Sequence, residues 1–252
     1  MTRKVNRHSQ IGLDRLVRLE WLERTASLVL AGNSELVIKE TLQHEISGSF
    51  RTKDTSVCGS ISKTIKVLHQ VWVSPPIELK IINKAGLDLL TRLPSEYHIA
   101  VHWGMIMSAY PFWANVAIQT GRLLRLQSNV TSVQVQRRIR EQYGERETVA
   151  RRARYVLRSF VSWGVLVETE KKGLYKTSVP LAIDNQELML WLAEAYLFSQ
   201  QNSSIPANEM FGSPAYYPFR FKTGNLESLI MKSDRLEIIK HSLDAINVTH
   251  KK

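Results

Sequence analysis

Apolar residues recur every three or four positions in the N-terminal part of the chain. The first run, from Leu13 to Ala26, predicts a helix that ends at Gly32, because glycine tolerates the left-handed conformation that often follows a helix. Similar runs predict further helices over residues 34–42 and 60–71, and a fourth that opens at Pro75–Pro76 and carries Leu79, Ile82, Leu87 and Leu90. The segment 47–60 is rich in Ser, Thr and Gly and is predicted to be a loop. We therefore expect an all-helical N-terminal half.

Residues 97–121 form a long stretch without Asp, Glu, Lys or Arg. Its twenty-five residues are enough to span a bilayer. However, His98 and His102 are polar and Pro111 interrupts the stretch, which favours two buried helices that meet at Tyr110. The first ten residues are polar and basic and precede no apolar core, so a signal peptide is not expected. We expect a cytoplasmic protein that does not enter the membrane.

The pattern changes over residues 121–183. Thr131 or Ser132 can cap a helix that Gly144 ends, and a tight turn then leads into a second helix at 147–163. The apolar residues of this second helix form one stripe with a period of 3.6, namely Val149, Ala153, Val156, Leu157 and Phe160. One face of this helix is therefore predicted to pack on a core while the opposite face meets solvent.

A short β-hairpin is predicted directly after this helix. Gly164 ends the helix, and the apolar run 165–167 is the first strand. A turn at 170–173 carries two lysines, and residues 174–178 form the return strand before Pro180. The hairpin would therefore present positive charge at its tip.

The last part of the chain gives weaker signals. A helix is predicted over residues 185–198, followed by a polar loop at 201–215. The aromatic run 216–221 alternates loosely, which favours a packed strand over a platform that stacks on bases. The tail 235–249 is compatible with either helix or strand.

The charge is concentrated in one region. The 252 residues contain 34 Lys and Arg against 23 Asp and Glu, a net charge of +11, and 44% of them are hydrophobic. This apolar content argues against a disordered chain, and the single cysteine, Cys58, excludes a disulfide scaffold. Residues 121–183, hereafter the basic segment, hold thirteen Lys and Arg against five Glu, so they carry +8 and the rest of the chain only +3. This distribution favours a localised nucleic-acid contact over diffuse attraction to a membrane.

The order of predicted elements over residues 112–180 is helix, helix, tight turn, helix, strand, basic turn and strand. Together with the phrase ERETVARRARYVLRSFVSWGVL (145–166), this order resembles a winged helix-turn-helix domain. The resemblance implies that the third helix enters the major groove of double-stranded DNA and that the hairpin, or wing, contacts the DNA backbone or minor groove. The expected DNA-binding residues are Arg137, Arg138, Arg146, Thr148, Arg151, Arg152, Tyr155, Arg158, Lys171 and Lys172.

The predicted positions of these residues suggest different roles. Thr148, Arg151, Arg152 and Tyr155 are predicted to lie roughly opposite the apolar stripe, near the start of the third helix, where base contacts are expected. The arginines of the preceding helix and the lysines of the turn are better placed for phosphates. Two other interpretations remain open, since a basic helix face can simply be solvated and winged helices also dock proteins. A scaffold or adaptor subunit with a protein partner is therefore the alternative function.

The sequence contains no familiar catalytic motif. A GxxxxGK[ST] phosphate loop, an HExxH pattern and a GxSxG elbow are all absent. His98 and His102 have the i, i+4 spacing of metal ligands, but buried, hydrogen-bonded histidines are the simpler expectation. We expect a non-enzymatic protein with no cofactor and no metal.

Several features together resemble the BrxA-type proteins of BREX phage-defence systems. They are the helical N-terminal half, the element Tyr110-Pro111-Phe112, the Arg-rich region and the ending VLRSFVSWGVL (156–166). The resemblance implies a small bacterial DNA-binding component of a multi-protein anti-phage system, with other subunits of that system as partners. Other bacterial or mobile-element winged-helix proteins fit the sequence nearly as well.

The predicted fold is mainly α with a small β-hairpin wing. A helical N-terminal domain is expected over residues 1–110 and a winged helix-turn-helix domain over 111–183. Residues 184–252 are expected to form a C-terminal helix and short strands that pack on the body.

Overall fold

The computed structural model describes residues 6–48, 55–222, 224, 226–240 and 246–251. The α-helices in these ranges are α1 (Leu19–Leu30), α2 (Glu35–Ser47), α3 (Thr55–Leu68), α4 (Lys80–Arg92), α5 (His98–Ala109), α6 (Pro111–Leu126), α7 (Ser132–Tyr143), α8 (Glu147–Ser162), α9 (Gln186–Ser199), α10 (Ala207–Gly212) and α11 (Leu226–Met231). A π-helical turn (His69–Val73) follows α3, and short 3-10 helices lie at Arg7–Ser9, Ile77–Leu79, Ser95–Tyr97 and Pro214–Tyr216. The strands are β1 (Val130–Thr131), β2 (Leu166–Glu168), β3 (Leu174–Thr177), β4 (Leu181–Ile183), β5 (Ser204–Pro206), β6 (Phe219–Phe221), β7 (Leu236–Lys240) and β8 (Ile246–His250). The predicted mainly helical class is confirmed.

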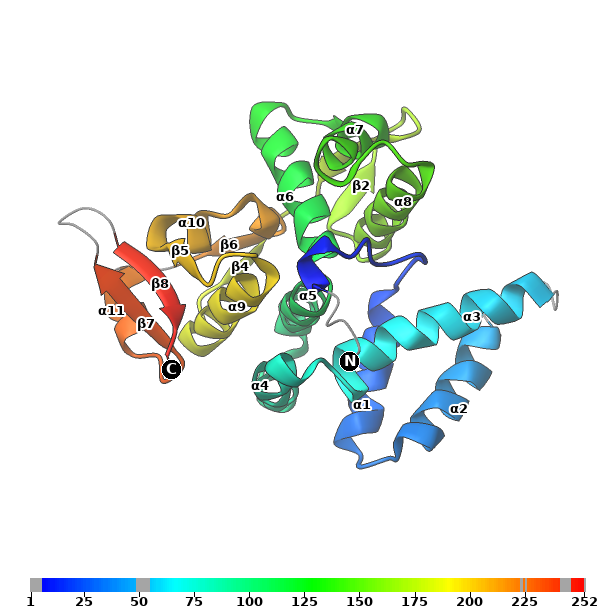
Figure 1. Ribbon diagram of the computed structural model, residues 1–252, viewed down its shortest axis with the longest axis horizontal. Coiled ribbons are helices and arrows are strands. Elements are labelled where there is room, and N and C mark those ends of the chain that lie inside the picture. Colours follow the sequence, from blue (N-terminus) through cyan, green and yellow to red (C-terminus); the bar gives the residue numbers. More distant parts are fainter. Residues whose placement is uncertain (1–5, 49–54, 223, 225, 241–245, 252) are drawn as a thin grey trace.

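These elements surround one central helix. Figure 1 shows α5 in the middle, α1–α3 on one side, the α6–α8 group above, and α9 with the C-terminal strands on the other side. A continuous cluster of buried side chains runs from Leu13 to Val248. The three predicted domains therefore share one core in the described part of the chain.

Local signals define the first helices. The Ser34 side chain accepts a hydrogen bond of 3.4 Å from the amide three residues later, and Gly32 adopts a φ of 75° between α1 and α2. The predicted loop up to residue 60 is wrong in its second half, because α3 already begins at Thr55 and includes Cys58. Residues 49–54 of that loop lie outside the described residues. Packing of the apolar stripe of α3 outweighs the weak helix propensity of Ser and Thr.

Residues 10–18, hereafter the N-terminal strap, form no helix, although the sequence predicts one from Leu13. Leu13 adopts a left-handed φ of 59°, which interrupts a helix and costs about 1–2 kcal/mol. The strap instead crosses α8. The Val17 amide donates to Ser159 Oγ at 3.0 Å, and Trp163 Nε1 donates to the Val17 carbonyl at 2.9 Å. The apolar pattern of the strap therefore reflects burial under a distant helix.

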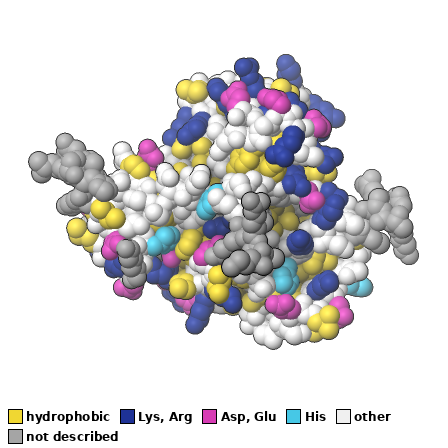
Figure 2. Space-filling view, in the orientation of Figure 1, with side chains coloured by type: hydrophobic (Ala, Val, Ile, Leu, Met, Phe, Trp, Pro, Cys, Tyr) yellow, Lys and Arg dark blue, Asp and Glu magenta, His cyan; other side chains and the backbone are white. Residues whose placement is uncertain are grey.

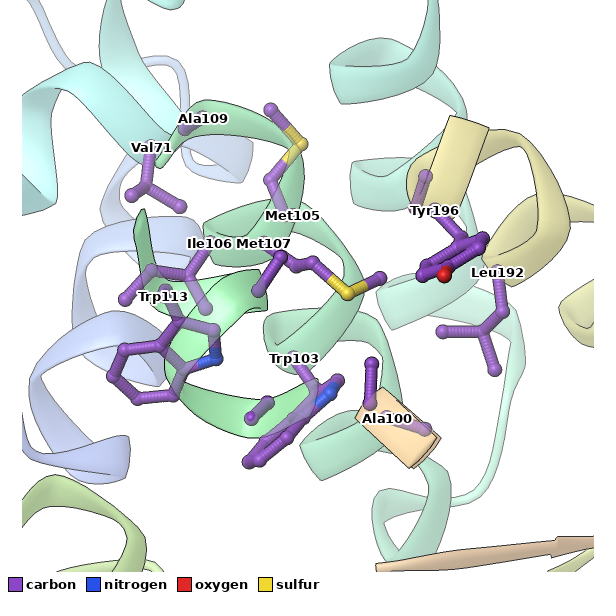
Figure 3. Packing of buried hydrophobic residues seen from close by; sticks show 14 of the residues in the cluster. Val71, Ala100, Trp103, Met105, Ile106, Met107, Ala109, Trp113, Leu192 and Tyr196 are labelled. Carbon is purple, nitrogen blue, oxygen red and sulfur yellow. The ribbon is translucent and has the colours of Figure 1, made fainter. Parts of the chain in front are cut away.

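Helix α5 is buried on almost every side. All residues from Ala100 to Ala109 are buried, and α4, α6 and α9 pack around them. Figure 3 shows its side chains against Leu192 and Tyr196 of α9. Gly104 permits this approach, because a Cβ there would lie 2.4 Å from the Trp191 ring. The prediction of two buried helices over 97–121 is confirmed. No helix in the described part of the chain has the length and apolar character needed to cross a membrane.

The elements α6, β1, α7, α8, β2 and β3 follow one another along the chain. Strand β3 lies between β1 and β2 in a three-stranded antiparallel sheet, with Val130 opposite Tyr175 and Val167 opposite Lys176. Gly173, with a φ of 78°, lies in the turn directly before β3. The predicted hairpin is present, whereas β1 was not predicted because two residues carry no periodic signal.

An aromatic cluster joins α8 to the rest of the fold. The part of the described chain outside the basic segment is hereafter called the body. The ring of Phe160 on α8 lies 4.9 Å from the Trp103 ring of α5 and 4.9 Å from the Trp113 ring of α6. Trp163 packs against Trp113 at 5.1 Å. Such pairs stabilise a junction beyond simple area burial. The position of α8 is therefore set by the body as well as by its neighbours in sequence.

The C-terminal part contains more regular structure than predicted. Segment 201–215 was predicted to be a loop but contains β5 and α10, and the ambiguous tail forms β7 and β8. Only residues 219–221 of the aromatic run form a strand, β6, which pairs in parallel with β4. The predicted boundary at residue 183 therefore falls at the end of a strand that belongs to the C-terminal part.

Candidate nucleic-acid interface

Helix α7 carries the first two predicted DNA-binding residues. Thr131 and Gln134 form a reciprocal cap, each side chain bonding to the other's backbone amide. Arg137 and Arg138 are exposed, and the Glu141 carboxylate lies 3.4 Å and 3.3 Å from their guanidinium groups. Because two arginines share one carboxylate, this surface keeps a positive charge.

Two acidic residues, Glu145 and Glu147, lie at the turn into α8. Gly144 adopts a φ of 94°, and Arg146 is the exposed residue that precedes α8. Glu145 and Glu147 lie 4.0 Å and 3.0 Å from the Arg140 guanidinium. These carboxylates therefore neutralise positive charge on α7 more than positive charge on the exposed face of α8.

Helix α8 separates into a buried face and an exposed face. The five residues of the predicted apolar stripe are buried, whereas Thr148, Arg151, Arg154 and Arg158 are exposed. Arg154 lies 3.9 Å from Glu147. Among the described carboxylates, none lies within ion-pair distance of Arg151 or Arg158. This face therefore offers two uncompensated guanidinium groups to an external anion.

The structure corrects the positions predicted for two residues of α8. Arg152 is half-buried and donates to the Ile11 carbonyl of the N-terminal strap. Tyr155 is also half-buried, and the Arg15 guanidinium lies 6.0 Å from its ring centre. Both face the strap because it covers one flank of α8. A helical wheel cannot reveal a neighbour 141 residues away in sequence.

The hairpin tip carries the remaining predicted residues. Lys171 and Lys172 are exposed, and the Gly173 amide donates to the Glu168 carboxylate at 2.6 Å, which helps to hold the turn. Lys176 on β3 is exposed as well but was not predicted as a site residue. The same is true of Arg154. The sequence does contain a signal for it, because Arg154 follows Arg151 by three residues and a helix places such residues on the same face.

These residues form one basic surface. Figure 2 shows Lys and Arg side chains gathered over the part of the molecule that contains α6–α8 and continuing along the side toward α3. A few acidic side chains are interspersed among them. This surface therefore carries an excess of positive charge.

His98 and His102 meet a carboxylate from another helix. Trp72 Nε1 donates to His102 Nδ1 at 3.0 Å, and the His102 Nε2–H donates to Glu23 Oε2 at 2.5 Å. His98 Nδ1 lies 2.8 Å from the other Glu23 oxygen. These hydrogen bonds lower the pKa of Glu23 to about 2, whereas burial lowers the pKa of His102.

This arrangement leaves His102 no free nitrogen for a metal. The described residues contain no group of three or more His, Cys, Asp or Glu side chains arranged to hold a metal ion. The helical spacing of the two histidines therefore serves hydrogen bonding between α1 and α5.

Comparison of the chain with protein-family models, with curated proteins and with solved structures found no match.

Proposed function

We propose that this chain is a non-enzymatic protein that binds double-stranded DNA through a winged helix-turn-helix domain. In this proposal α8 is the recognition helix and the β2–β3 hairpin is the wing. The order of helices and the sheet order β1-β3-β2 support the comparison with that fold. The observation that carries the proposal is the exposed face of α8, where Arg151 and Arg158 lack carboxylate partners among the described residues.

The two groups of basic residues suit different contacts. Thr148 and Arg151 lie in the first turns of α8, the part of a recognition helix that reaches base edges in the major groove. The arginines of α7 and the lysines of the hairpin tip flank this face and are suited to phosphates, which fix the register of the protein on DNA. Binding is therefore expected to weaken steeply with salt.

The test is a salt titration of binding to a labelled 20-base-pair duplex, followed by fluorescence anisotropy. We expect Thr148→Ala/Arg151→Ala to weaken duplex binding by about 10- to 100-fold at one fixed salt concentration. A matched control removes two exposed lysines on the far side of the body, Lys80→Ala/Lys84→Ala, and should change the affinity much less. Equal effects of the two double variants would contradict a specific role for α8.

A protein-docking function has one observation in its favour. Four aliphatic side chains near the hairpin and the α6–α7 connection are exposed, namely Leu126, Val133, Val167 and Val179. Under this alternative the chain would show no salt-sensitive duplex binding and would form a stoichiometric complex that Val133→Ser/Val167→Ser weakens. Salt-sensitive duplex binding by the purified chain favours the DNA proposal instead.

Membership of a phage-defence system stays a prediction based on the motif resemblance. The motif residues have structural positions in this fold: Pro111 begins α6, and Phe112, Phe160 and Trp163 are buried. These residues therefore support a resemblance of the hydrophobic core to that of BrxA-type proteins more than a resemblance of activity. The expected outcome is that Arg151→Ala abolishes phage resistance in cells that carry the complete system, as measured by plaque counts.

A further inference from the structure

A second basic feature lies beside α8 and belongs to the helical body. A cleft of about 390 Å³ opens between the N-terminal strap, α1, α3 and α8. Three arginines line it, Arg15 and Arg18 from the strap and Arg158 from α8, together with Trp21 and Tyr155. No Asp or Glu is among the described residues that line the cleft. Its chemistry is therefore that of an anion site.

Aromatic rings hold two of these arginines in place. The Arg18 guanidinium lies 5.3 Å from the centre of the Trp21 ring, and the Arg15 guanidinium lies 6.0 Å from that of Tyr155. Such cation–π contacts favour these positions of the two guanidinium groups beside the cleft. The cleft is therefore organised before any ligand arrives.

The hydrogen-bonding capacity of these arginines is only partly used. The Nε atoms of Arg15 and Arg18 are buried and have no hydrogen-bond partner among the described residues. A ligand in the cleft would meet the terminal Nη groups instead. There Arg15 Nη1 donates to the Asp14 carbonyl at 2.5 Å and Arg18 Nη1 donates to Glu20 at 3.3 Å. The other Nη groups of the two side chains have no partner among the described residues, which favours a ligand with several acceptor oxygens. Glu20 pairs with Arg18 at 3.3 Å and Asp14 pairs with Lys63 at 3.6 Å, so Arg15 and Arg158 have no carboxylate partner among the described residues.

We propose that this cleft binds a phosphate group, and that in the DNA complex this group belongs to the backbone of the duplex contacted by α8. The assignment to DNA rests on the proposed function. Arg158 joins the two surfaces, since it lines the cleft and also lies on the exposed face of α8, two turns or about 10 Å beyond Arg151. The bound duplex would therefore run from the hairpin across α8 and onto the helical body.

The DNA arm of the test uses Arg15→Gln/Arg18→Gln in the full chain. We expect duplex affinity to fall about tenfold and the slope of log affinity against log salt to decrease in magnitude by about one. Arg15→Lys/Arg18→Lys keeps the charge but loses the planar fork, so it should recover only part of the affinity. Lys80→Gln/Lys84→Gln, which removes the same charge elsewhere, should leave the salt slope nearly unchanged. Thermal unfolding shows whether each variant is folded.

The second arm uses inorganic pyrophosphate and isothermal titration calorimetry in the absence of DNA. The wild-type chain should bind it, and Arg15→Gln/Arg18→Gln should lose that binding. If this variant fails to fold, Arg158→Gln replaces it, since its side chain is exposed.

The two arms separate the possible outcomes. An unchanged duplex affinity and salt slope in Arg15→Gln/Arg18→Gln would overturn the DNA path over the cleft, even where pyrophosphate binding identifies a site for a free phosphate compound. Absence of pyrophosphate binding together with an unchanged duplex affinity would overturn the phosphate site altogether. If wild-type chain binds no DNA but loses pyrophosphate binding on mutation, the proposed function fails and the phosphate site stands.

Discussion

Charged side chains are arranged differently in the helical body and in the basic segment. In the body, Arg24 is paired with Glu45 at 2.7 Å, and Arg92 lies between two carboxylates, Asp88 and Glu187, at 2.7 Å and 2.6 Å. On α8 and the hairpin tip, by contrast, several bases project without a carboxylate partner within the described part of the chain. Exposed ion pairs contribute little stability each, but they neutralise the surface of the body. The net positive charge is therefore concentrated in the basic segment, which carries +8 of the +11 and can attract a polyanion.

The largest expected effect is the loss of stability on removing a buried side chain between α4, α5 and α9. Trp191 is buried, donates from Nε1 to the Ile82 carbonyl at 2.9 Å and fills the space beside Gly86 and Gly104. We expect Trp191→Ala to lower the free energy of unfolding by about 3–5 kcal/mol in urea titrations. Val133→Ala, at an exposed position of α7, is the control and should stay within about 0.5 kcal/mol of wild type. A loss below 1 kcal/mol for the tryptophan variant would contradict the central role of α5 and α9.

Arg151 and Arg152 provide a sharper test, because Arg151 lies on the exposed basic face of α8 whereas Arg152 contacts the N-terminal strap. Arg152→Ala removes the hydrogen bond to the strap and should lower the free energy of unfolding by about 1–3 kcal/mol. Arg151→Ala should leave stability within about 0.5 kcal/mol of wild type while weakening duplex binding. Urea unfolding and anisotropy on the same two variants measure both effects. Indistinguishable stabilities would show that the strap is not anchored by Arg152.

Acid should weaken the body through the pair of helices joined by Glu23. The folded chain keeps Glu23 ionised down to a pKa of about 2 and His102 neutral below its ordinary value of 6.5. The unfolded chain binds these protons first, so stability should fall as the pH decreases, from about 6.5 for His102 and from about 4.5 for Glu23. The midpoint of thermal unfolding between pH 8 and pH 4 measures this effect. His102→Gln should flatten the upper part of the profile, and an identical slope in that variant would assign it to other groups.

The smallest effect is expected at the hairpin tip. Lys171→Ala/Lys172→Ala should reduce the magnitude of the salt slope of duplex binding by about two, with an unchanged unfolding midpoint. The change should be similar for duplexes of different sequence, because phosphate contacts do not distinguish bases. A strong sequence dependence would instead indicate that the tip reads a groove.

The sequence predicted best those elements whose signals are local. The α7 cap at Thr131, the stops at Gly144 and Gly164 and the apolar stripe of α8 can each be read within one or two turns. The stretch of residues 97–121 was also predicted correctly as two buried helices, because a proline and two histidines argued against a membrane span.

The incorrect predictions involve contacts between distant parts of the chain. Leu13 and Val17 have helical spacing but are buried in a non-helical segment, and the partner of the Val17 amide, Ser159 on α8, lies 142 residues further along. For the same reason Arg152 was predicted on the exposed face, and the cleft containing Arg15 and Arg18 could not be predicted. Short strands such as β1 and β4 depend on partners whose register no local pattern specifies.

The N-terminal strap also has a consequence for the order of events during synthesis. Val17 leaves the ribosome 142 residues before Ser159, a delay of about 7 to 28 s at 5–20 residues per second. The strap therefore emerges early but can dock only after α8 has formed. In that interval the nascent chain holds Val17 without its hydrogen-bond partners Ser159 and Trp163.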